Sequence, residues 1–509
     1  MGLSKKFLWK YRIALGLFCI IVSVLGLLQS RSASGLLATP IGSSGSVKVA
    51  GQIDSDLNFG LNLALKTYTC GRKRPADTEH YNGGWLDYDV AARRKMYPED
   101  FVGYHGKQRI YTRDVIQDTK CKKLMEKDVE LKPLDHIAQC SPDEMLYGTR
   151  TAQHIIHRHQ NPIDPHHSCA EKNFMFFTIP SHGLGSIWHI TTAFMAIAME
   201  HDRILIPANS PSCDFDNSDG TNFYDCYFEE MSSCTTWARE HVTPQLCKGA
   251  EFEGYGCLPH LSKEQDHRDQ QFTFFTFYIL DNVAQLSYTI VPYQFAPLLA
   301  CSPISEADSF YWWRAQAVAY LLRPDSFARA EIDARIQAYY KERRQLPAHS
   351  IALHIRRGDK EKELKSLTSD ESFVRALNAS ILSVDWTRLH GIPKAKHIFV
   401  STEDKGSLDY IVNAFANVDD VQVSYATVPR HSSKSSPMEI AKKIGPQNEV
   451  FNSLLNLRLS LQAHSVMGIF GSNWVRLIDE LRSTIGCHSN GLMIDPSQPD
   501  WLNGYSLEW

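Results

Sequence analysis

The sequence predicts an α/β protein with two lobes, the second built on a doubly wound parallel sheet. Two apolar runs, 174–179 and 203–206, flank a helical stretch at 186–200 and together describe a strand-turn-helix-strand unit. From residue 350 to residue 481, short apolar runs alternate with helical patterns. The chain has 509 residues, which is more than one hydrophobic core usually serves. We therefore expect two lobes with a ligand site between them.

The N-terminal region is expected to anchor the chain in a membrane. Residues 13–28 carry no charge, and at about 1.5 Å per residue they span about 24 Å, which suits a thin bilayer. The preceding segment contains four basic residues, Lys5, Lys6, Lys10 and Arg12. Because positive charge stays in the cytosol, we expect a cytosolic tail at 1–12, a signal anchor at 13–28 and a lumenal remainder. A signal peptide cleaved near Ser32 is the alternative.

The segment after the anchor is expected to be a stem followed by a region without an assigned role. Residues 29–56 are rich in Ser, Gly and Ala, which is typical of a flexible linker. Residues 57–167 show no heptad repeat, and no role is assigned to them. This region ends in a group of histidines, His154, His157, His159, His166 and His167. Their irregular spacing and the prolines among them favour a polar loop over a metal site.

Composition restricts the class of protein. The net charge of −4 and the isoelectric point near 6.6 give no indication of a basic surface for nucleic acid. Twelve cysteines, none of them in a Cys-x-x-Cys pair, favour lumenal disulfides over a structural zinc site. Asn378-Ala379-Ser380 is an N-glycosylation sequon and is expected at the surface. These features suit a glycoprotein of the secretory pathway.

The first lobe is expected over residues 168–345. Its first apolar run leads through Gly183 and Gly185 into a helix. Glycines at a helix N-terminus let backbone amides approach a phosphate or a sugar hydroxyl, although tight helix packing explains them equally well. The sequence has no Gly-x-x-x-x-Gly-Lys-Ser/Thr loop, which argues against a P-loop enzyme. Helices expected at 311–322 and 326–342 complete the lobe.

The second lobe is expected over residues 346–485, with residues 486–509 as a C-terminal tail. Its expected strands are 350–353, 397–401, 421–425 and 466–470, and its expected helices are 406–415, 449–464 and 473–481. Open parallel sheets bind ligands at the carboxyl ends of their strands. Polar residues follow three of these strands and should lie on that rim: Arg356, Glu403, Asp404, Ser472 and Asn473.

The segment His354-Ile-Arg-Arg-Gly-Asp-Lys360 is the main candidate for a ligand site. It follows a buried strand and presents Arg356 and Arg357 beside a glycine. A guanidinium offers a planar fork of donors that matches phosphate oxygens, and a carboxylate such as that of Asp359 can fix the fork in place. These residues favour a diphosphate as the ligand. A solvated turn with an Arg–Asp pair remains the alternative.

Five motifs resemble those of the eukaryotic core alpha-1,6-fucosyltransferases of glycosyltransferase family 23. They are HGLGSIWHI (182–190), YWWRAQAVAYLLRP (311–324), HIRRGDK (354–360), STED (401–404) and FGSNWVRLIDEL (470–481). The resemblance runs from about Cys169 to Arg482. It implies a GT-B-like two-lobed nucleotide-sugar transferase with a C-terminal Rossmann-like lobe. The implied reaction is inverting transfer of L-fucose from GDP-fucose to a glycan hydroxyl without a metal or cofactor, alpha-1,6 to the core GlcNAc of N-glycans.

The resemblance also implies roles for individual residues. Arg356 would clamp the diphosphate, with Lys360 beside it and Glu363 as the base, if one residue is deleted relative to the family. The residues implied to contact GDP-fucose are His354, Arg356, Arg357, Asp359, Gly183, Gly185, Glu403, Asp404, Asn456, Ser472 and Asn473. Asn456 stands where the family has an aspartate that accepts from guanine, and it offers one acceptor oxygen instead of two. Cys169 and Cys234 are the implied disulfide.

The resemblance further implies a single-pass type II protein of the Golgi membrane with a lumenal catalytic domain, and a homodimer is possible. The chain ends 27 residues after Arg482, before the SH3 domain that the family carries. Rival functions are protein O-fucosylation, transfer from another GDP-sugar, and non-catalytic carbohydrate binding in the lumen. A metal-dependent transferase is another rival, because three Asp-x-Asp sequences occur, at 54–56, 87–89 and 214–216.

Overall fold

The chain divides into two units, and every residue that the structure describes belongs to the second, Asn58–Trp509. The computed structural model describes residues 119–130, 134–136, 140–162, 168–177, 183–207, 224–241, 272–275, 291–302, 304, 309–340, 345–358, 368–389, 393–430, 437–489 and 491–497. The predicted tail, anchor and stem, the three Asp-x-Asp sequences and residues 359–367 lie outside these ranges. None of the described helices combines the length and the apolar character needed to cross a membrane.

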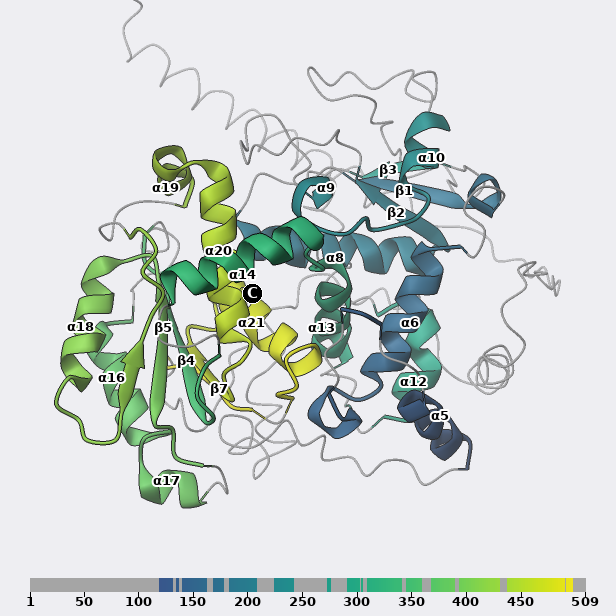
Figure 1. Cartoon of the computed structure of the whole chain (residues 1–509). Coiled ribbons are helices and arrows are strands. Elements are labelled where there is room, and N and C mark those ends of the chain that lie inside the picture. Colours follow the sequence, from purple (N-terminus) through teal and green to yellow (C-terminus); the bar gives the residue numbers. More distant parts are fainter. Residues whose placement is uncertain are drawn as a thin grey trace, which may run out of the picture. The chain divides into compact units, whose positions relative to one another are not determined.

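The first lobe contains a three-stranded parallel sheet in the order β2-β1-β3 (Figure 1). Its strands are β1 (Asn173–Phe177), β2 (Arg203–Pro207) and β3 (Phe272–Phe275). The connection from β1 to β2 is α8 (Leu184–Glu200), so the predicted strand-turn-helix-strand unit is confirmed. Side chains alternate across β1: Met175 and Phe177 join the core on the α8 side, and Phe174 and Phe176 pack on the opposite side.

Helix α6 (Thr149–Gln160) packs along β2, which is an edge strand of this sheet. Gln160 Nε2 donates to the carbonyl of Leu205 at 3.2 Å, and its Oε1 accepts from the amide of Leu205 at 3.1 Å. The side chain thereby satisfies backbone groups of the edge strand β2. Of the predicted histidine loop, His154, His157 and His159 lie in α6, so the loop prediction is wrong for these three residues. The other two histidines lie outside the described residues.

The second lobe contains a five-stranded parallel sheet in the order β6-β5-β4-β7-β8. Its strands are β4 (Ser350–Ile355), β5 (His397–Thr402), β6 (Gln422–Ser424), β7 (Ser465–Gly468) and β8 (Met493–Ile494). Counted along the lobe this order is 3-2-1-4-5, which is the Rossmann arrangement. The predicted doubly wound parallel sheet is confirmed, and β8 adds an edge strand from the segment 486–509.

Helices cover both faces of this sheet. On one face lie α16 (Asp370–Ala379) and α18 (Lys405–Phe415), which pack on Ile351, Leu353 and Ile355. On the other face lie α20 (Pro446–Ser460) and α21 (Asn473–Thr484), whose core includes Ala352 and Phe399. Two short helices complete the lobe, α17 (Val384–Leu389) and α19 (Pro437–Ile444). The sheet is therefore buried on both sides, as its continuous apolar strands require.

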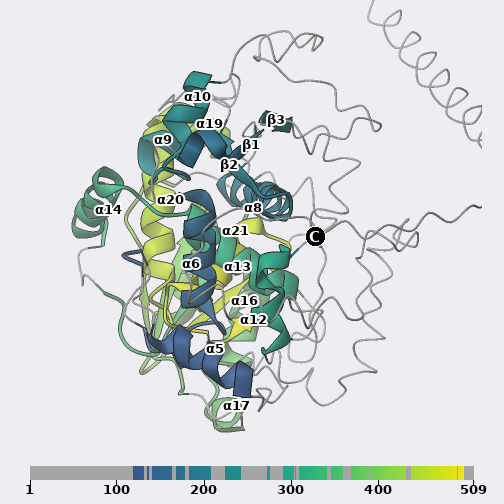
Figure 2. The same ribbon diagram turned by 90° about the vertical axis from the view of Figure 1, so that its right-hand side faces the viewer.

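A shared helical layer joins the two lobes. Helix α13 (Ser309–Leu321) packs against both α8 and α21, and the three helices lie next to one another in both ribbon views (Figures 1 and 2). Trp188 of α8, Trp313 of α13 and Leu477 of α21 belong to one continuous core. Helix α14 (Ser326–Tyr339) follows α13 and packs on α20. The lobes thus share one interior.

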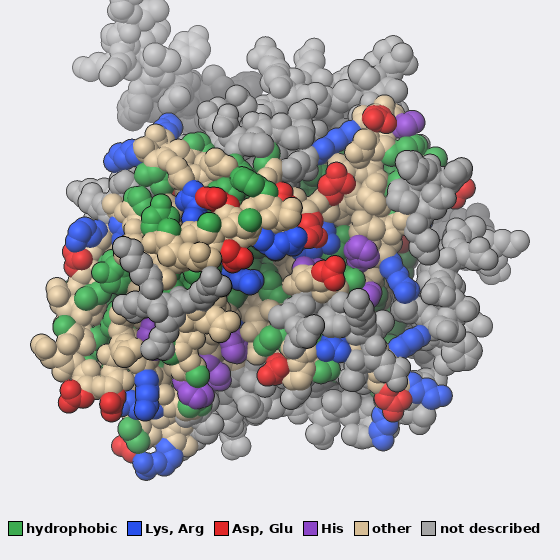
Figure 3. Space-filling model, in the orientation of Figure 1, with side chains coloured by type: hydrophobic (Ala, Val, Ile, Leu, Met, Phe, Trp, Pro, Cys, Tyr) green, Lys and Arg blue, Asp and Glu red, His purple; other side chains and the backbone are tan. Residues whose placement is uncertain are grey.

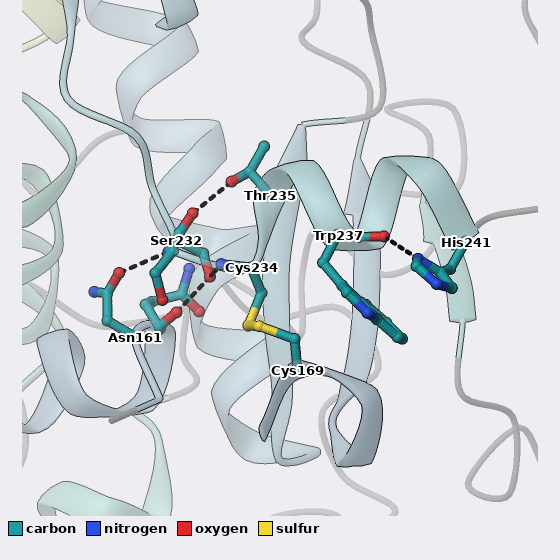
Figure 4. The surroundings of a disulfide bond; sticks show 9 residues. Asn161, Cys169, Ser232, Cys234, Thr235, Trp237 and His241 are labelled. Carbon is teal, nitrogen blue, oxygen red and sulfur yellow. Dashed lines mark hydrogen bonds between the residues drawn. A yellow bond between two sulfur atoms is a disulfide. The ribbon is translucent and has the colours of Figure 1, made fainter. Parts of the chain in front are cut away.

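Three disulfides that join cysteines within the described residues support this arrangement. Cys169–Cys234 ties the start of β1 to α10 (Thr235–His241), and its surroundings include the stacked rings of Trp237 and His241 (Figure 4). This is the pair that the sequence resemblance implied, and the structure confirms it. The other two bonds are Cys121–Cys301, which begins in α5 (Thr119–Glu130), and Cys140–Cys487.

The remaining short elements connect these layers. They are α9 (Tyr224–Tyr227), α12 (Ala296–Ala300) and the 3-10 turns Pro142–Glu144, Cys169–Glu171 and Tyr293–Phe295. On the face shown in Figure 3, acidic and basic side chains of the described residues are interspersed.

Candidate nucleotide-diphosphate site

The candidate site lies at the carboxyl ends of β4, β5 and β7. In the Rossmann arrangement the strand order reverses between β4 and β7, and ligands bind outside the carboxyl ends at this switch point. Arg356 follows β4 directly, Glu403 follows β5, and Ser472 precedes α21 in the loop after β7. The structure thus brings residues from three separate predicted motifs to one edge of the sheet.

Arg356 is held at this edge by Glu403. Its Nη1 forms an ion pair with Glu403 Oε1 and donates to the carbonyl of Arg357 at 2.8 Å. The same carboxylate oxygen accepts from the backbone amide of Arg357 at 2.7 Å. The side chains of Arg356 and Glu403 remain 15% and 20% exposed. Glu403 therefore fixes the guanidinium of Arg356 at a partly exposed position. The sequence predicted this role for Asp359, which lies outside the described residues.

Arg357 turns toward the helices on the other side of the strand. Its Nε donates to Ser407 Oγ at 3.1 Å, and its Nη2 pairs with Asp370 Oδ1. These contacts join the end of β4 to α18 and α16. Gly358 follows with a φ of +65°, a left-handed conformation that glycine adopts without strain. Arg357 thus supports the turn that carries Arg356, and only its Nη1 has no hydrogen-bond partner among the described residues.

His354 and Asn456 each have a buried polar side-chain atom without a hydrogen-bond partner among the described residues. His354 is buried, its Nδ1 lies 3.3 Å from Ser401 Oγ, and its Nε2 has no partner among the described residues. Burial lowers the pKa of His354 to about 4, so its ring is neutral at pH 7. Asn456 donates from Nδ2 to the carbonyl of Asn452 at 2.8 Å, whereas its buried Oδ1 has no described partner. A buried polar atom without a partner costs about 1–3 kcal/mol, which a bound ligand can recover.

Asp404 has a structural role in the described contacts. Its Oδ1 accepts from the amide of Ser407 at 2.7 Å and caps the N-terminus of α18. Ser472 is the N-cap residue of α21, is buried, and makes no capping hydrogen bond with its side chain. The hydroxyl of Ser472 is therefore better placed than the carboxylate of Asp404 to serve a ligand at the helix N-terminus.

Asn473 and Gly185 join the two lobes at the same end of the sheet. Asn473 Nδ2 donates to Ser186 Oγ at 2.7 Å, and its Oδ1 lies 2.9 Å from His189 Nδ1. A Cβ atom on Gly185 would lie 2.9 Å from the backbone of Asn473 and Trp474. Of the two explanations that the sequence left open for the glycines, close helix packing therefore holds for Gly185. Gly183 has no atom within 4 Å of an added Cβ.

The two glycines provide a matched pair for mutation. We expect Gly185→Ala to lower the free energy of unfolding by about 1–3 kcal/mol, because the helices α8 and α21 must separate to admit the methyl group. Gly183→Ala should leave it within about 0.5 kcal/mol of wild type. Urea unfolding of both variants measures the difference, and equal stabilities would contradict the assigned packing role.

A network of buried charged side chains lies where α8, α13 and α21 meet. Glu480 Oε2 is 2.9 Å from His189 Nε2, and Glu480 Oε1 pairs with Arg314 Nε. All three side chains are at most 4% exposed. Burial by itself raises the pKa of Glu480, but the charge of Arg314 and the hydrogen bond from His189 outweigh it and hold the pKa below its usual value. This network was not predicted from the sequence, although Glu480 lies within the helix expected at 473–481.

The remaining predicted catalytic residues, Lys360 and Glu363, lie outside the described residues, as does Asp359. Asn378, the sequon residue, is exposed on α16.

Comparison with known proteins gave matches only among solved structures. No protein-family model matches the chain, and no curated protein sequence matches it. A NodZ alpha-1,6-fucosyltransferase soaked with GDP-fucose is 16% identical over 61% of this chain and 93% of its own, with a TM-score of 0.31. A mutant of Arabidopsis thaliana FUT1 in complex with GDP is 12% identical over 72% and 82%, with a TM-score of 0.36. POFUT1 with GDP-fucose is 13% identical over 66% and 98%, with a TM-score of 0.35. At these levels of similarity, the function of this chain has to be argued from its own residues.

Proposed function

We propose that this protein is an inverting, metal-independent fucosyltransferase that uses GDP-fucose. The observation that carries the proposal is the position of Arg356, held by Glu403 at the carboxyl end of the central strand, next to the switch point of a Rossmann-type sheet. The unsatisfied atoms His354 Nε2 and Asn456 Oδ1 belong to the same lobe and are explained by a ligand. The sequence motifs around these residues supply the identity of the sugar.

The proposed reaction is a single displacement at the anomeric carbon of fucose. The acceptor hydroxyl oxygen forms the new bond to this carbon, while the bond between the carbon and the β-phosphate oxygen breaks. GDP leaves with the bonding electrons, and the hydroxyl proton passes to a carboxylate, for which Glu363 is the proposed base. Negative charge therefore develops on the diphosphate, where the guanidinium of Arg356 stabilises it. Lys360 would support the same charge.

Recognition of guanine is proposed for His354 and Asn456. Guanine presents N–H donors on its Watson–Crick edge, and the unpartnered Oδ1 of Asn456 is an acceptor. The neutral ring of His354 offers a second polar contact, from β4. A site that hydrogen-bonds a substrate rejects an analogue that leaves its buried polar groups unpaired. GDP should therefore bind more tightly than ADP.

Within this activity, we propose a specific acceptor and compartment. The protein transfers fucose in alpha-1,6 linkage to the core GlcNAc of N-glycans, in the lumen of the Golgi. It is supported by the five motifs and, for the compartment, by the predicted anchor, the exposed sequon at Asn378 and the disulfides among the described residues. A homodimer remains part of the proposal. The runner-up activity is O-fucosylation of folded protein domains, which differs only in the acceptor.

An assay with several donors and acceptors tests this proposal. The purified protein is incubated with GDP-fucose, GDP-mannose, UDP-GlcNAc or UDP-galactose, in the presence of EDTA, and with either an N-glycan or a folded EGF-like domain. We expect a mass increase of one fucose on the N-glycan with GDP-fucose only. Fucose on the EGF-like domain would favour the runner-up, and loss of turnover in EDTA would contradict a metal-independent reaction. Failure to bind GDP would favour a non-catalytic carbohydrate-binding protein.

A further inference from the structure

Asp495 is a buried carboxylate in the segment that follows the last predicted helix, and the proposed reaction does not use it. It comes directly after β8, which pairs with β7 so that Ile494 is the partner of Met467. Asp495 is only 5% exposed. Because parallel strands end at the same edge of a sheet, Asp495 lies at the carboxyl edge, which is the edge of the candidate site.

Three hydrogen bonds fix the carboxylate of Asp495. Its Oδ2 accepts from the backbone amide of Phe470 at 2.8 Å. Its Oδ1 accepts from the backbone amide of Ser497 at 2.9 Å and from the hydroxyl of Ser497 at 2.7 Å. An aspartate that binds the amide two residues ahead closes an Asx turn. Both carboxylate oxygens are therefore occupied inside the fold, so Asp495 acts on the chain around it and not directly on a ligand.

The bond to Phe470 connects Asp495 to the loop that leads from β7 into α21, which we call loop 469–472. A hydrogen bond of 3.0 Å from the amide of Ser472 to the carbonyl of Ile469 closes this loop. Ser472 is the N-cap residue of α21, and its buried side chain makes no capping hydrogen bond. By holding Phe470, the carboxylate of Asp495 therefore fixes the position at which α21 begins.

Loop 469–472 lies beside Arg356. Strands β4 and β7 are adjacent and parallel, and His354 is the register partner of Gly468. Arg356 and Phe470 each follow this pair by two residues, so they leave neighbouring strands at the same level of the sheet. A diphosphate held by Arg356 therefore lies next to the loop in the proposed complex.

Gly471 gives a second reason to place the diphosphate at this loop. It is exposed, and its φ is not in the left-handed region. A Cβ atom at this position would meet only Cγ2 of Ile469, at 3.9 Å. Neither the backbone conformation nor the packing of the described residues requires a glycine here. Close approach of the backbone to a ligand is the requirement that remains.

We propose that Asp495 is a positioning residue for the diphosphate: through the amide of Phe470, its carboxylate holds loop 469–472 against the phosphate groups that Arg356 clamps. The inference rests on the proposed GDP-fucose site. The hydroxyl of Ser472 and the first amides of α21, which have no partner within the helix, are the donors that the loop presents to the phosphate oxygens. Removal of the carboxylate releases the loop and displaces these donors.

Calorimetric titration of Asp495→Ala with GDP and with guanosine tests the inference. We expect the Kd for GDP to rise by about 10–100-fold, because a displacement of about 1 Å can cost that much, and the Kd for guanosine to stay within about twofold of wild type. Asp495→Asn keeps one acceptor oxygen for the amide of Phe470, so it should recover most of the affinity for GDP. A carboxylate that only stabilised the fold would not separate the two ligands.

Two control variants remove comparable hydrogen bonds without releasing the loop. Ser497→Ala removes the hydroxyl that donates to Asp495 but keeps the bond between Asp495 and Phe470. Asp325→Ala removes a carboxylate that accepts from the amide of Ala328 at 2.6 Å, at the start of α14. Both variants should bind GDP with the affinity of the wild type, although Asp325→Ala loses a helix cap and should be less stable.

Gly471→Ala tests the same loop and leaves Asp495 in place. The added methyl group meets no close atom in the fold, so this variant should fold like the wild type. We expect it to raise the Kd for GDP by about tenfold, because the methyl group separates the loop backbone from the phosphate, and to leave the Kd for guanosine unchanged. It keeps the inference testable even if Asp495→Ala folds poorly.

The outcomes separate the inference from the proposed function. An unchanged Kd for GDP in folded Asp495→Ala, or equal losses for GDP and guanosine, would overturn the positioning role. Wild-type affinity for GDP in Gly471→Ala would overturn it as well, because the loop would then not approach the diphosphate. In all of these cases the wild type still binds GDP, and the proposed function stands. Absence of GDP binding to the wild type would refute the proposed function and this inference with it.

Discussion

Replacing Arg356 with alanine should lower kcat/KM for fucosyl transfer by about 10²–10³-fold, the loss expected on removal of a preorganised donor to developing charge. The structure places this guanidinium at the switch point and fixes it through Glu403. Arg356→Lys keeps the charge and a partner for Glu403 but loses the planar fork, so it should recover only part of the rate. Transfer kinetics with purified variants measure both effects.

The control for this prediction is an arginine outside the site. Arg388 is 75% exposed and pairs only loosely with Asp385, at 3.7 Å. Arg388→Ala should therefore retain wild-type kinetics. Near-normal turnover in Arg356→Ala, with folding intact by circular dichroism, would refute the clamp.

Replacing Glu480 with alanine should lower the free energy of unfolding by about 3–5 kcal/mol, because Arg314 would keep a buried charge without this carboxylate. The hydrogen bond to His189 would be lost as well, at the junction of α8, α13 and α21. Glu480→Gln keeps the shape and one acceptor, and we expect a smaller loss. Denaturant unfolding gives the values. A loss below about 1 kcal/mol for the alanine variant would show that the network does not hold the lobes together.

The same network predicts a dependence of stability on pH. The pKa of Glu480 lies below its ordinary value of 4.5 in the folded protein. Its contribution is therefore present above about pH 4.5 and is lost as the pH falls through the lower folded pKa. Wild type should lose stability relative to Glu480→Gln on acidification below pH 4.5, and parallel unfolding curves for the two proteins would contradict this.

The sequence predicted most of the fold because its signals were local and periodic. The alternation of strands and helices after residue 350 places β4, β5, β6 and β7 within a few residues of their observed bounds. Helix α6 was missed because its inward face is partly polar: Gln153 and Gln160 are buried and bonded to the backbone of other elements. Hydrophobic periodicity does not detect a face of this kind.

The sequence predicted the candidate site at the carboxyl ends of the strands, but it did not predict which side chains there pair with one another. Which carboxylate fixes Arg356 depends on the register of β4 and β5, in which Ile355 is the partner of Thr402. This register brings Glu403 next to Arg356 from 47 positions away. Asn473 and Gly185, which are expected to contact the nucleotide, also join α21 to α8, a contact between segments that are remote in sequence.

Calorimetric titration of the purified protein with GDP, alongside Arg356→Ala and with guanosine as a second ligand, most directly tests whether this edge of the sheet binds a nucleoside diphosphate. We predict saturable one-site binding of GDP by the wild type, and weaker binding of guanosine, which lacks the diphosphate. Arg356→Ala should lose about 1.5–3 kcal/mol of binding free energy for GDP and almost none for guanosine. Equal GDP affinity in the wild type and Arg356→Ala, or no binding of GDP at all, would contradict the account.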